Sequence, residues 1–187
     1  MKSKILQIID DSIAVKQNSK ALVPVIYKIA KEIINCYRRK NKVVIFGNGG
    51  SAADAQHIAT ELVCRFEKER KSLNALALTT NTSILTAVAN DYSFDKIFSR
   101  QIESTVQKSD VVIAISTSGN SKNVVEAAKQ AKKHGAVVVG FTGADGGKLK
   151  RVCDIILKVP SKNTARIQEV HITVGHILCK LVEDEPF

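Results

Sequence analysis

The sequence predicts a single α/β domain in which a five-stranded parallel sheet has helices packed on both faces. Five short, strongly apolar runs alternate with stretches of helical periodicity after residue 42, and this alternation is typical of parallel strands joined by crossover helices. The chain has 187 residues, 44% hydrophobic and 25% charged, which fits one domain and excludes a disordered or collagen-like chain. No repeat, low-complexity tract or linker divides it. We therefore expect one domain over 1–187, made of a helical pair (1–40) and an α/β core (42–187).

The predicted elements follow from apolar spacing and from turn residues. Residues 3–21 and 23–40 have helical periodicity, and Pro24 suits the first turn of the second helix. This pair has no strand to cross over to, so an interface within a dimer or tetramer is a plausible place for its apolar faces. The predicted strands are 42–47, 73–79, 111–116, 136–142 and 154–159. The predicted core helices are 52–66, 81–106 with a break around Asn90-Asp91, 121–134 and 164–183.

The charge balance favours anionic partners. With 28 Lys+Arg against 18 Asp+Glu, the net charge is +10, and nucleic acid, anionic lipid or phosphorylated metabolites are the partners that such a charge attracts. The basic residues are spread along the chain, however, and only six Phe and three Tyr accompany them. A dedicated nucleic-acid-binding protein is therefore not favoured.

The cysteines and the N-terminal residues bear on the cellular compartment. Cys36, Cys64, Cys153 and Cys179 are isolated, without a CxxC pair, which is typical of reduced thiols in a reducing compartment. The first residues lack the apolar core of a signal peptide, and no apolar run approaches the ~18 residues of a membrane span. We expect a cytoplasmic protein.

Two loops that follow predicted strands carry the chemistry of a phosphate site. In VVIFGNGGS, glycines 47, 49 and 50 let the backbone approach a ligand, and Ser51 can cap the following helix. In VVIAISTSGNS, four hydroxyl residues surround Gly119 ahead of a helix N-terminus, namely Ser116, Thr117, Ser118 and Ser121. Neither loop contains GxGxxG or GK[ST], so a dinucleotide or ATP is disfavoured. The alternative is a pair of ordinary βα turns whose hydroxyls only cap helices.

The helix predicted after the glycine-rich loop carries candidate metal ligands. His57, Glu61 and Arg65 are spaced by four, beside the apolar stripe, and an imidazole and a carboxylate at i, i+4 can share a metal ion. The alternative is a solvated face with a Glu61–Arg65 ion pair. The apolar stripe itself consists of Ala55, Ile58, Ala59, Leu62 and Phe66.

The spacing of the last predicted helix does not decide which of its two histidines faces a ligand site. Gln168, Ile172 and His176 follow one flank, but spacing does not decide whether His176 or His171 faces a cleft, and a solvated His176 is the plainer alternative. His134 precedes Gly135 and suits a helix C-terminus. The predicted apolar stripe consists of Ile167, Val170, Val174, Ile177 and Leu181.

Four segments together resemble the phosphoheptose isomerase family of the sugar-isomerase (SIS) proteins. They are GNGGSAADAQHIATEL, VANDYSF, STSGNSKNV and ARIQEVHITVGHIL, and the resemblance covers nearly the whole chain. It implies a flavodoxin-like, three-layer SIS fold and a homotetramer with active sites at subunit interfaces. The implied reaction is the isomerisation of D-sedoheptulose 7-phosphate to D-glycero-D-manno-heptose 7-phosphate. That product leads to nucleotide-activated heptose for bacterial envelope polysaccharide, including lipopolysaccharide.

The resemblance also implies residue roles. One Zn²⁺ per subunit would be held by His57, Glu61, Gln168 and His176, which chooses His176 over His171, although other divalent ions suit this ligand set. Glu61 would be the base and His176 its partner acid/base, exchanging protons through an enediol(ate). The implied substrate contacts are Asn48, Gly49, Gly50, Ser51, Glu61, Arg65, Asn90, Asp91, Ser116, Thr117, Ser118, Ser121 and Gln168.

Two other functions share parts of this pattern. The TARIQE segment around Ala165 is also similar to a relative that associates with a replication initiator protein, a tetrameric binding module without the metal ligands. This chain keeps all four ligand positions, and His176 is the residue that discriminates. An SIS-domain transcription regulator would need an appended helix-turn-helix domain, which the opening 40 residues do not resemble.

Overall fold

The computed structural model describes all 187 residues and contains one five-stranded, all-parallel sheet. The strands are β1 (Val43–Gly47), β2 (Ala75–Ala77), β3 (Val111–Ile115), β4 (Val137–Thr142) and β5 (Ile155–Lys158). Their order across the sheet is β2-β1-β3-β4-β5, the doubly wound order of flavodoxin-like folds, in which ligands bind where the strand order reverses. That point lies between β1 and β3, where Gly47 and Ile115 are register partners at the strand ends. The predicted α/β fold is confirmed.

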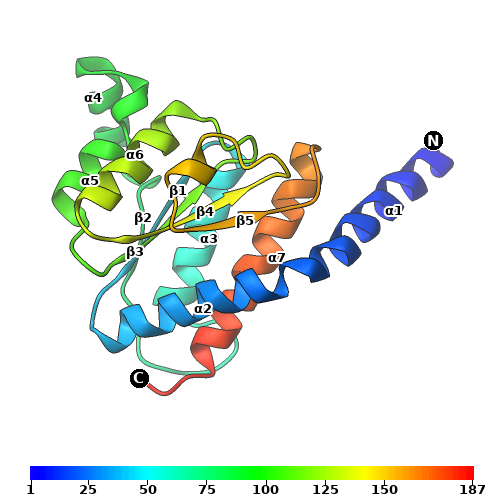
Figure 1. The fold of residues 1–187 in the computed structure, drawn as a ribbon, viewed down its shortest axis with the longest axis horizontal. Helices are drawn as coiled ribbons and strands as arrows, with labels where there is room; N and C mark the ends of the chain where they lie inside the picture. The colour runs from blue at the N-terminus through cyan, green and yellow to red at the C-terminus, as the bar shows by residue number, and fades with distance from the viewer.

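Helices cover both faces of the sheet (Figure 1). They are α1 (Lys2–Asn18), α2 (Val23–Arg38), α3 (Gly50–Val63), α4 (Thr82–Asp91), α5 (Ser99–Thr105), α6 (Lys122–Lys133) and α7 (Thr164–Glu183), with short 3-10 turns at Ser19–Leu22, Phe94–Lys96 and Leu149–Arg151. Alternate residues of each strand enter opposite layers: Val43 and Ile45 pack with α2, α3 and α7, whereas Val44 and Phe46 pack with α5 and α6. Because both faces are covered, the strands are continuous apolar runs.

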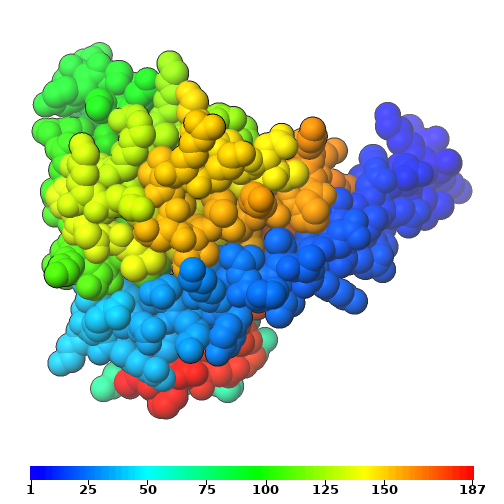
Figure 2. Space-filling view, in the orientation of Figure 1, coloured from blue at the N-terminus to red at the C-terminus, as the bar shows by residue number.

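The two opening helices have different roles. Helix α2 buries Ile26, Ile29 and Ile33 against α7 and the sheet, and Pro24 stands in its first turn as predicted. Helix α1 buries no residue and projects from the body of the molecule (Figure 2). It exposes a row of large apolar side chains, Ile5, Leu6, Ile8, Ile9 and Ile13.

Several predicted boundaries are wrong. The helix expected at 52–66 spans Gly50–Val63, so Arg65 and Phe66 lie in the following loop. Ser51 does not cap that helix, because Gly49 is the N-cap and Ser51 is buried inside the first turn. The predicted strand 73–79 shortens to Ala75–Ala77. The break predicted around Asn90-Asp91 is confirmed, because α4 ends at Asp91 and a 3-10 turn and α5 follow it.

The buried stripe of α7 also differs from the prediction. Ile177 and Leu181 are exposed, whereas their neighbours Leu178 and Val182 are buried. Both members of each neighbouring pair are apolar, so periodicity alone allowed two faces, and packing against α2 and α3 selected one.

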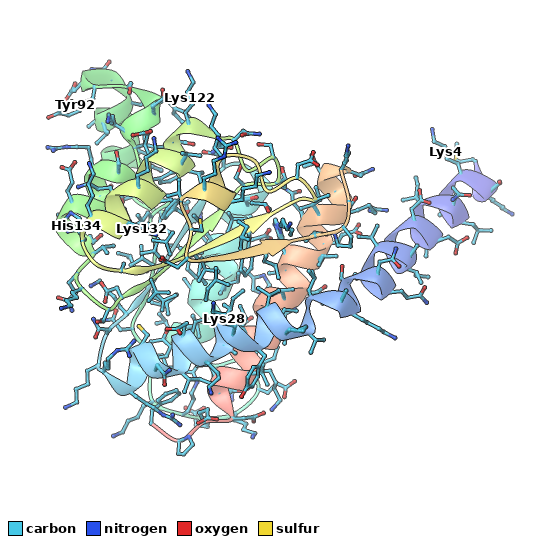
Figure 3. The ribbon with its side chains drawn as sticks, viewed as in Figure 1. Lys4, Lys28, Tyr92, Lys122, Lys132 and His134 are labelled. Atoms are coloured by element: carbon cyan, nitrogen blue, oxygen red, sulfur yellow. The ribbon has the colours of Figure 1, made fainter.

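The surface charges are dispersed, as expected. Figure 3 places Lys4 on the projecting α1, Lys28 on α2, and Lys122 and Lys132 on α6, on separate parts of the molecule. No helix is both long enough and apolar enough to cross a membrane. All four cysteines are free, and burial raises the pKa of the Cys36 thiol to about 11.

Candidate active site

The two predicted phosphate loops meet at the carboxyl edge of the sheet. Asn48, which follows β1, and Asn123, in the first turn of α6, exchange two amide hydrogen bonds of 2.9 Å. Between β3 and α6, the Ser116 and Ser121 hydroxyls lie 2.9 Å apart, and Ser118 Oγ lies 3.5 Å from Ser116 Oγ. Ser121 is the N-cap residue of α6, yet its side chain makes no capping bond. The Ser121 hydroxyl therefore does not cap α6 and lies against the Ser116 hydroxyl instead.

A polar cavity of about 270 Å³ adjoins this serine loop. Thr117 and Ser118 line one side of it, and Ser161, Lys162 and Thr164 line another. Hydroxyls and an ammonium group around one cavity suit an anionic or sugar ligand. Its remaining lining residues are Asn120, Gly143, Ala144, Asp145 and Ile167.

Two of the glycines stand where a side chain would be strained or would collide with a neighbour. Gly49 has φ +57°, a conformation that L side chains rarely adopt. At Gly50 an added Cβ would lie 2.6 Å from Gln168 Nε2 of α7. The glycine-rich loop is therefore in direct contact with the N-terminal half of α7, which carries Gln168.

Three of the four predicted metal ligands come together between α3 and α7. His57 Nε2 lies 3.1 Å from His176 Nε2 and 3.2 Å from Glu61 Oε1. His57 is about half exposed, and Glu61 is less so. The Phe66 ring also neighbours His176, with 5.6 Å between ring centroids.

The fourth predicted ligand lies elsewhere in this structure. The Gln168 amide contacts Gly50. Gln168 precedes His176 by eight residues, which separates the two Cα atoms by about 12 Å along the helix. No three His, Cys, Asp or Glu side chains form a closed metal-binding group. The arrangement is open because Glu61 and His176 each contact His57 but no hydrogen bond or ion pair joins them to each other.

His57 has a proton deficit, by which we mean that its Nε2 atom has two hydrogen-bonding neighbours but at most one proton to share with them. A single Nε2 atom carries at most one proton, a carboxylate only accepts, and His57 Nε2 faces both Glu61 and His176. One proton on that atom cannot make two strong hydrogen bonds. The separations of 3.1 and 3.2 Å are close to the edge, about 3.3 Å, of a zinc tetrahedron with bonds of about 2.0–2.1 Å. Two of the three separations in this donor set are therefore those of neighbouring zinc ligands, whereas Glu61 and His176 are not in contact with each other.

Asp54, one turn before His57 on α3, faces the same region. Its Oδ2 atom is buried without a hydrogen-bond partner. Burial raises the pKa of the Asp54 carboxyl to about 6, and the nearby His57 imidazole opposes part of that rise.

The structure distinguishes His171 from His176, which helical spacing could not do. His171 is fully buried, and one of its ring nitrogens lies 3.2 Å from the Thr142 carbonyl oxygen. Burial lowers the pKa of His171 to about 4, which keeps the ring neutral. His176, by contrast, faces His57. His134 ends α6, and Figure 3 shows it far from α7.

Three predicted substrate contacts lie outside this region of the chain. Asn90 and Asp91 are exposed at the end of α4 and hydrogen-bond to each other, and Figure 1 shows α4 projecting from the far side of the sheet. Arg65 is exposed and pairs with Glu69 at 3.4 Å rather than with Glu61.

The sequence pattern missed two polar residues that lie near the serine loop. Asn123 is buried beside Val124 and joins the two loops, and its signal was an amide on the inward face of a helix. Lys162 lines the cavity from the loop before α7, and no sequence signal distinguished it from the other lysines.

Comparison with known proteins identifies relatives of this chain. A family model described as SIS domain matches residues 10–143. The chain is 52% identical to phosphoheptose isomerase of Aneurinibacillus thermoaerophilus over 96% of this chain and 92% of that protein. Solved phosphoheptose isomerases from Neisseria gonorrhoeae and Francisella tularensis superpose with TM-scores of 0.94 and 0.95, at 41% and 37% identity. Both alignments cover 98% of this chain. They cover 99% of the Neisseria gonorrhoeae chain and 98% of the Francisella tularensis chain. None of these relatives supports the binding-module alternative.

Proposed function

The chain belongs to the phosphoheptose isomerases of the SIS-domain family, and from this we propose that it interconverts sedoheptulose 7-phosphate and D-glycero-D-manno-heptose 7-phosphate. The observation that carries the proposal is the convergence of His57, Glu61 and His176 between α3 and α7. A carboxylate and imidazoles within hydrogen-bonding reach are the groups that proton transfer between neighbouring carbons requires.

The chemistry that follows is an aldose–ketose isomerisation. A base removes a proton from C1 of the ketose, the O2 atom gains a proton to give the enediol, and O1 loses its proton as C2 receives one. Substrate and product are isomers, so no oxidant or reductant is consumed. We assign Glu61 as the base and His176 as the partner that returns a proton, each contributing about 10²–10⁴-fold.

Burial in the protein supports these roles. The Glu61 side chain is only 23% exposed, so few waters compete with the substrate for its carboxylate. The rings of Phe66 and His57 both pack near His176, with 5.6 and 5.0 Å between ring centroids. These contacts restrict the imidazole to few orientations, as an effective proton donor requires.

We propose Zn²⁺ as the cofactor, held by His57, Glu61, His176 and Gln168. The proton deficit at His57 and the ligand-like separations support the first three, and Gln168 would have to turn from Gly50 toward the metal. When bound, zinc supplies a Lewis acid that polarises the carbonyl and stabilises the enediolate. An amide in the ligand set also suits other divalent ions.

The serine loop is the proposed phosphate site. Ser116, Thr117, Ser118 and Ser121 gather at the carboxyl end of β3 and precede α6, whose free N–H groups favour an anion. Asn48, Gly49, Gly50 and Ser51 are the proposed sugar contacts on the neighbouring loop.

We further propose a homotetramer with shared active sites. Within one chain Arg65, Asn90 and Asp91 form no hydrogen bond or ion pair with the serine loop or with His57, Glu61 and His176, so a neighbouring subunit would supply them. Helix α4 also exposes Ile84, and Tyr92 and Phe94 follow it, an apolar surface suited to an interface. The free thiols suit a cytoplasmic enzyme, and its product would enter nucleotide-activated heptose synthesis for envelope polysaccharide.

Incubating the purified protein with sedoheptulose 7-phosphate tests the assignment. An aldose phosphate must form at the expense of the ketose. A ketose that stays unchanged, with folded protein and added zinc, would favour the binding module.

A further inference from the structure

Glu183 is a carboxylate in an unfavourable position. It is the last residue of α7, where the helix dipole disfavours negative charge, and its side chain is fully buried. A buried charge at such a place needs specific partners.

All of those partners lie on the loop that follows α3, residues 64–72, which we call the α3 exit loop. Glu183 Oε1 accepts a hydrogen bond from the Phe66 N–H at 2.9 Å, and Oε2 accepts from Glu67 and Lys68 N–H at 2.8 and 2.9 Å. Three successive N–H groups around one carboxylate form an anion-binding nest. Burial alone would raise the pKa of Glu183, but these bonds outweigh it and hold the pKa below its usual value.

Arg70, on the same loop, connects Glu183 with Glu61. Its Nε atom lies 3.5 Å from Glu183 Oε1, and its Nη2 atom donates a 2.7 Å hydrogen bond to the backbone carbonyl of Glu61. Glu61 stands in the last turn of α3, where carbonyls lack partners within the helix. The guanidinium therefore fixes the turn that presents the Glu61 carboxylate.

Phe66 connects Glu183 with the second proposed acid/base residue. Its N–H is bound by Glu183, and its ring faces the His176 imidazole at 5.6 Å and an angle of 32°. The buried Glu183–Arg70 pair therefore contacts the backbone of Glu61 and the backbone of Phe66, whose ring packs on His176.

We propose that Glu183 and Arg70 are positioning residues of the isomerase. They fix the position of the Glu61 carboxylate relative to the His176 imidazole and touch no substrate atom. The proposal rests on the proposed function for its kinetic consequence. Its structural content, the orientation of His176 by the exit loop, does not depend on that function.

The first test measures kcat and KM of Glu183→Gln and Arg70→Ala. The Gln amide keeps the shape but loses the charge and one acceptor, and Ala removes both arms of the guanidinium. Because small displacements of reacting groups are costly, kcat should fall about 10- to 100-fold while KM changes less than about threefold. Arg38→Ala is the matched control, since it breaks the exposed 2.7 Å pair with Glu185 near the same end of α7 and should leave kcat unchanged.

The second test is proton NMR of the four histidine rings, assigned with single histidine variants. In Glu183→Gln and Arg70→Ala the His176 resonance should move, because the Phe66 ring shifts relative to it, while that of His134 stays. If either variant fails to fold, Phe66→Leu replaces it and should give the same two results.

The proposal is overturned by a kcat within about twofold of the wild type, by an equal loss in Arg38→Ala, or by a His176 resonance that does not move. If wild-type protein shows no turnover, the isomerase assignment fails, and the NMR result alone decides whether the exit loop orients His176.

Discussion

At the scale of single residues, His57 is the centre of the account. Its one Nε2 atom faces a carboxylate and a second imidazole, an arrangement that a single proton cannot satisfy and on which the proposed divalent ion rests. Sequence spacing could predict His57 and Glu61 on one helix face but not the meeting with His176, because that contact joins residues 119 positions apart.

Metal removal tests that arrangement. Dialysis against a chelator should abolish isomerase activity, and added zinc should restore it with about one ion per chain by elemental analysis. His57→Gln should lower the metal content and keep the fold, whereas His134→Gln, at the end of α6, should retain full metal. Undiminished activity in protein shown to be metal-free would contradict the assignment.

His171 predicts a pH dependence of stability. Its pKa is about 4 in the folded protein against an ordinary 6.5, so between these values the unfolded chain binds more protons. Stability is then present above pH 6.5 and is lost as pH falls toward 4, by about 3 kcal/mol in total (2.5 pH units at about 1.36 kcal/mol each).

Urea titrations of wild type and His171→Gln at fixed protein concentration measure this effect. The Gln amide can still donate to Thr142 O but does not titrate, so the difference in unfolding free energy between the two proteins should change by about 1.4 kcal/mol per pH unit between about pH 4.5 and 6. Taking that difference removes the contribution of other groups such as Asp54. Parallel curves would show that His171 titrates normally.

At the scale of elements, the parallel sheet could be predicted well because fully buried strands are continuous apolar runs bounded by turns. The ends and faces of helices could not be predicted as well. Phe66 continued the apolar spacing of α3, but the chain leaves the helix after Val63 because the following N–H groups bind Glu183. Such a long-range acceptor leaves no local signal in the sequence.

Helix α1 is held to its own chain by polar contacts with α7. Arg166 donates a 2.7 Å hydrogen bond to the Ile8 carbonyl, and Ser12 donates one of 2.7 Å to Glu169. Its apolar side chains remain exposed. An isolated amphipathic helix of this kind needs a partner surface.

Replacing Ile9 and Ile13 together by Asp should therefore disrupt the assembly. We expect light scattering after gel filtration to show smaller species than the wild type forms, because four desolvated carboxylates per pair of helices cannot be buried. Lys4→Asp reverses a charge on α1 without removing an apolar side chain and should leave the assembly unchanged. An unchanged assembly in the double variant would remove α1 from the interface.

At the scale of the whole molecule, the placement of Asn90, Asp91 and Arg65 has the widest consequence. The resemblance could assign them to the substrate, but only the structure shows that Asn90 and Asp91 hydrogen-bond to each other, that Arg65 pairs with Glu69, and that none of the three bonds to the serine loop of the same chain. A site composed of two subunits explains both observations.

Subunit complementation tests shared sites directly. Asp91→Ala and Ser116→Ala should each abolish most activity as homotetramers. If each site takes Asp91 from one chain and Ser116 from another, co-refolded mixtures should recover on the order of a quarter of the sites. If tetramers that mass spectrometry shows to be mixed recover no activity, each site takes both residues from one chain.

The central claim, isomerisation by Glu61 and His176, is tested most directly by proton NMR of sedoheptulose 7-phosphate with purified, zinc-supplied protein over time. We predict that anomeric signals of an aldoheptose phosphate grow to equilibrium with the wild type, and at least about 100-fold more slowly with Glu61→Gln. Near-normal turnover by Glu61→Gln would contradict the role of Glu61. A spectrum that never changes, with a folded wild-type tetramer, would contradict the isomerase itself.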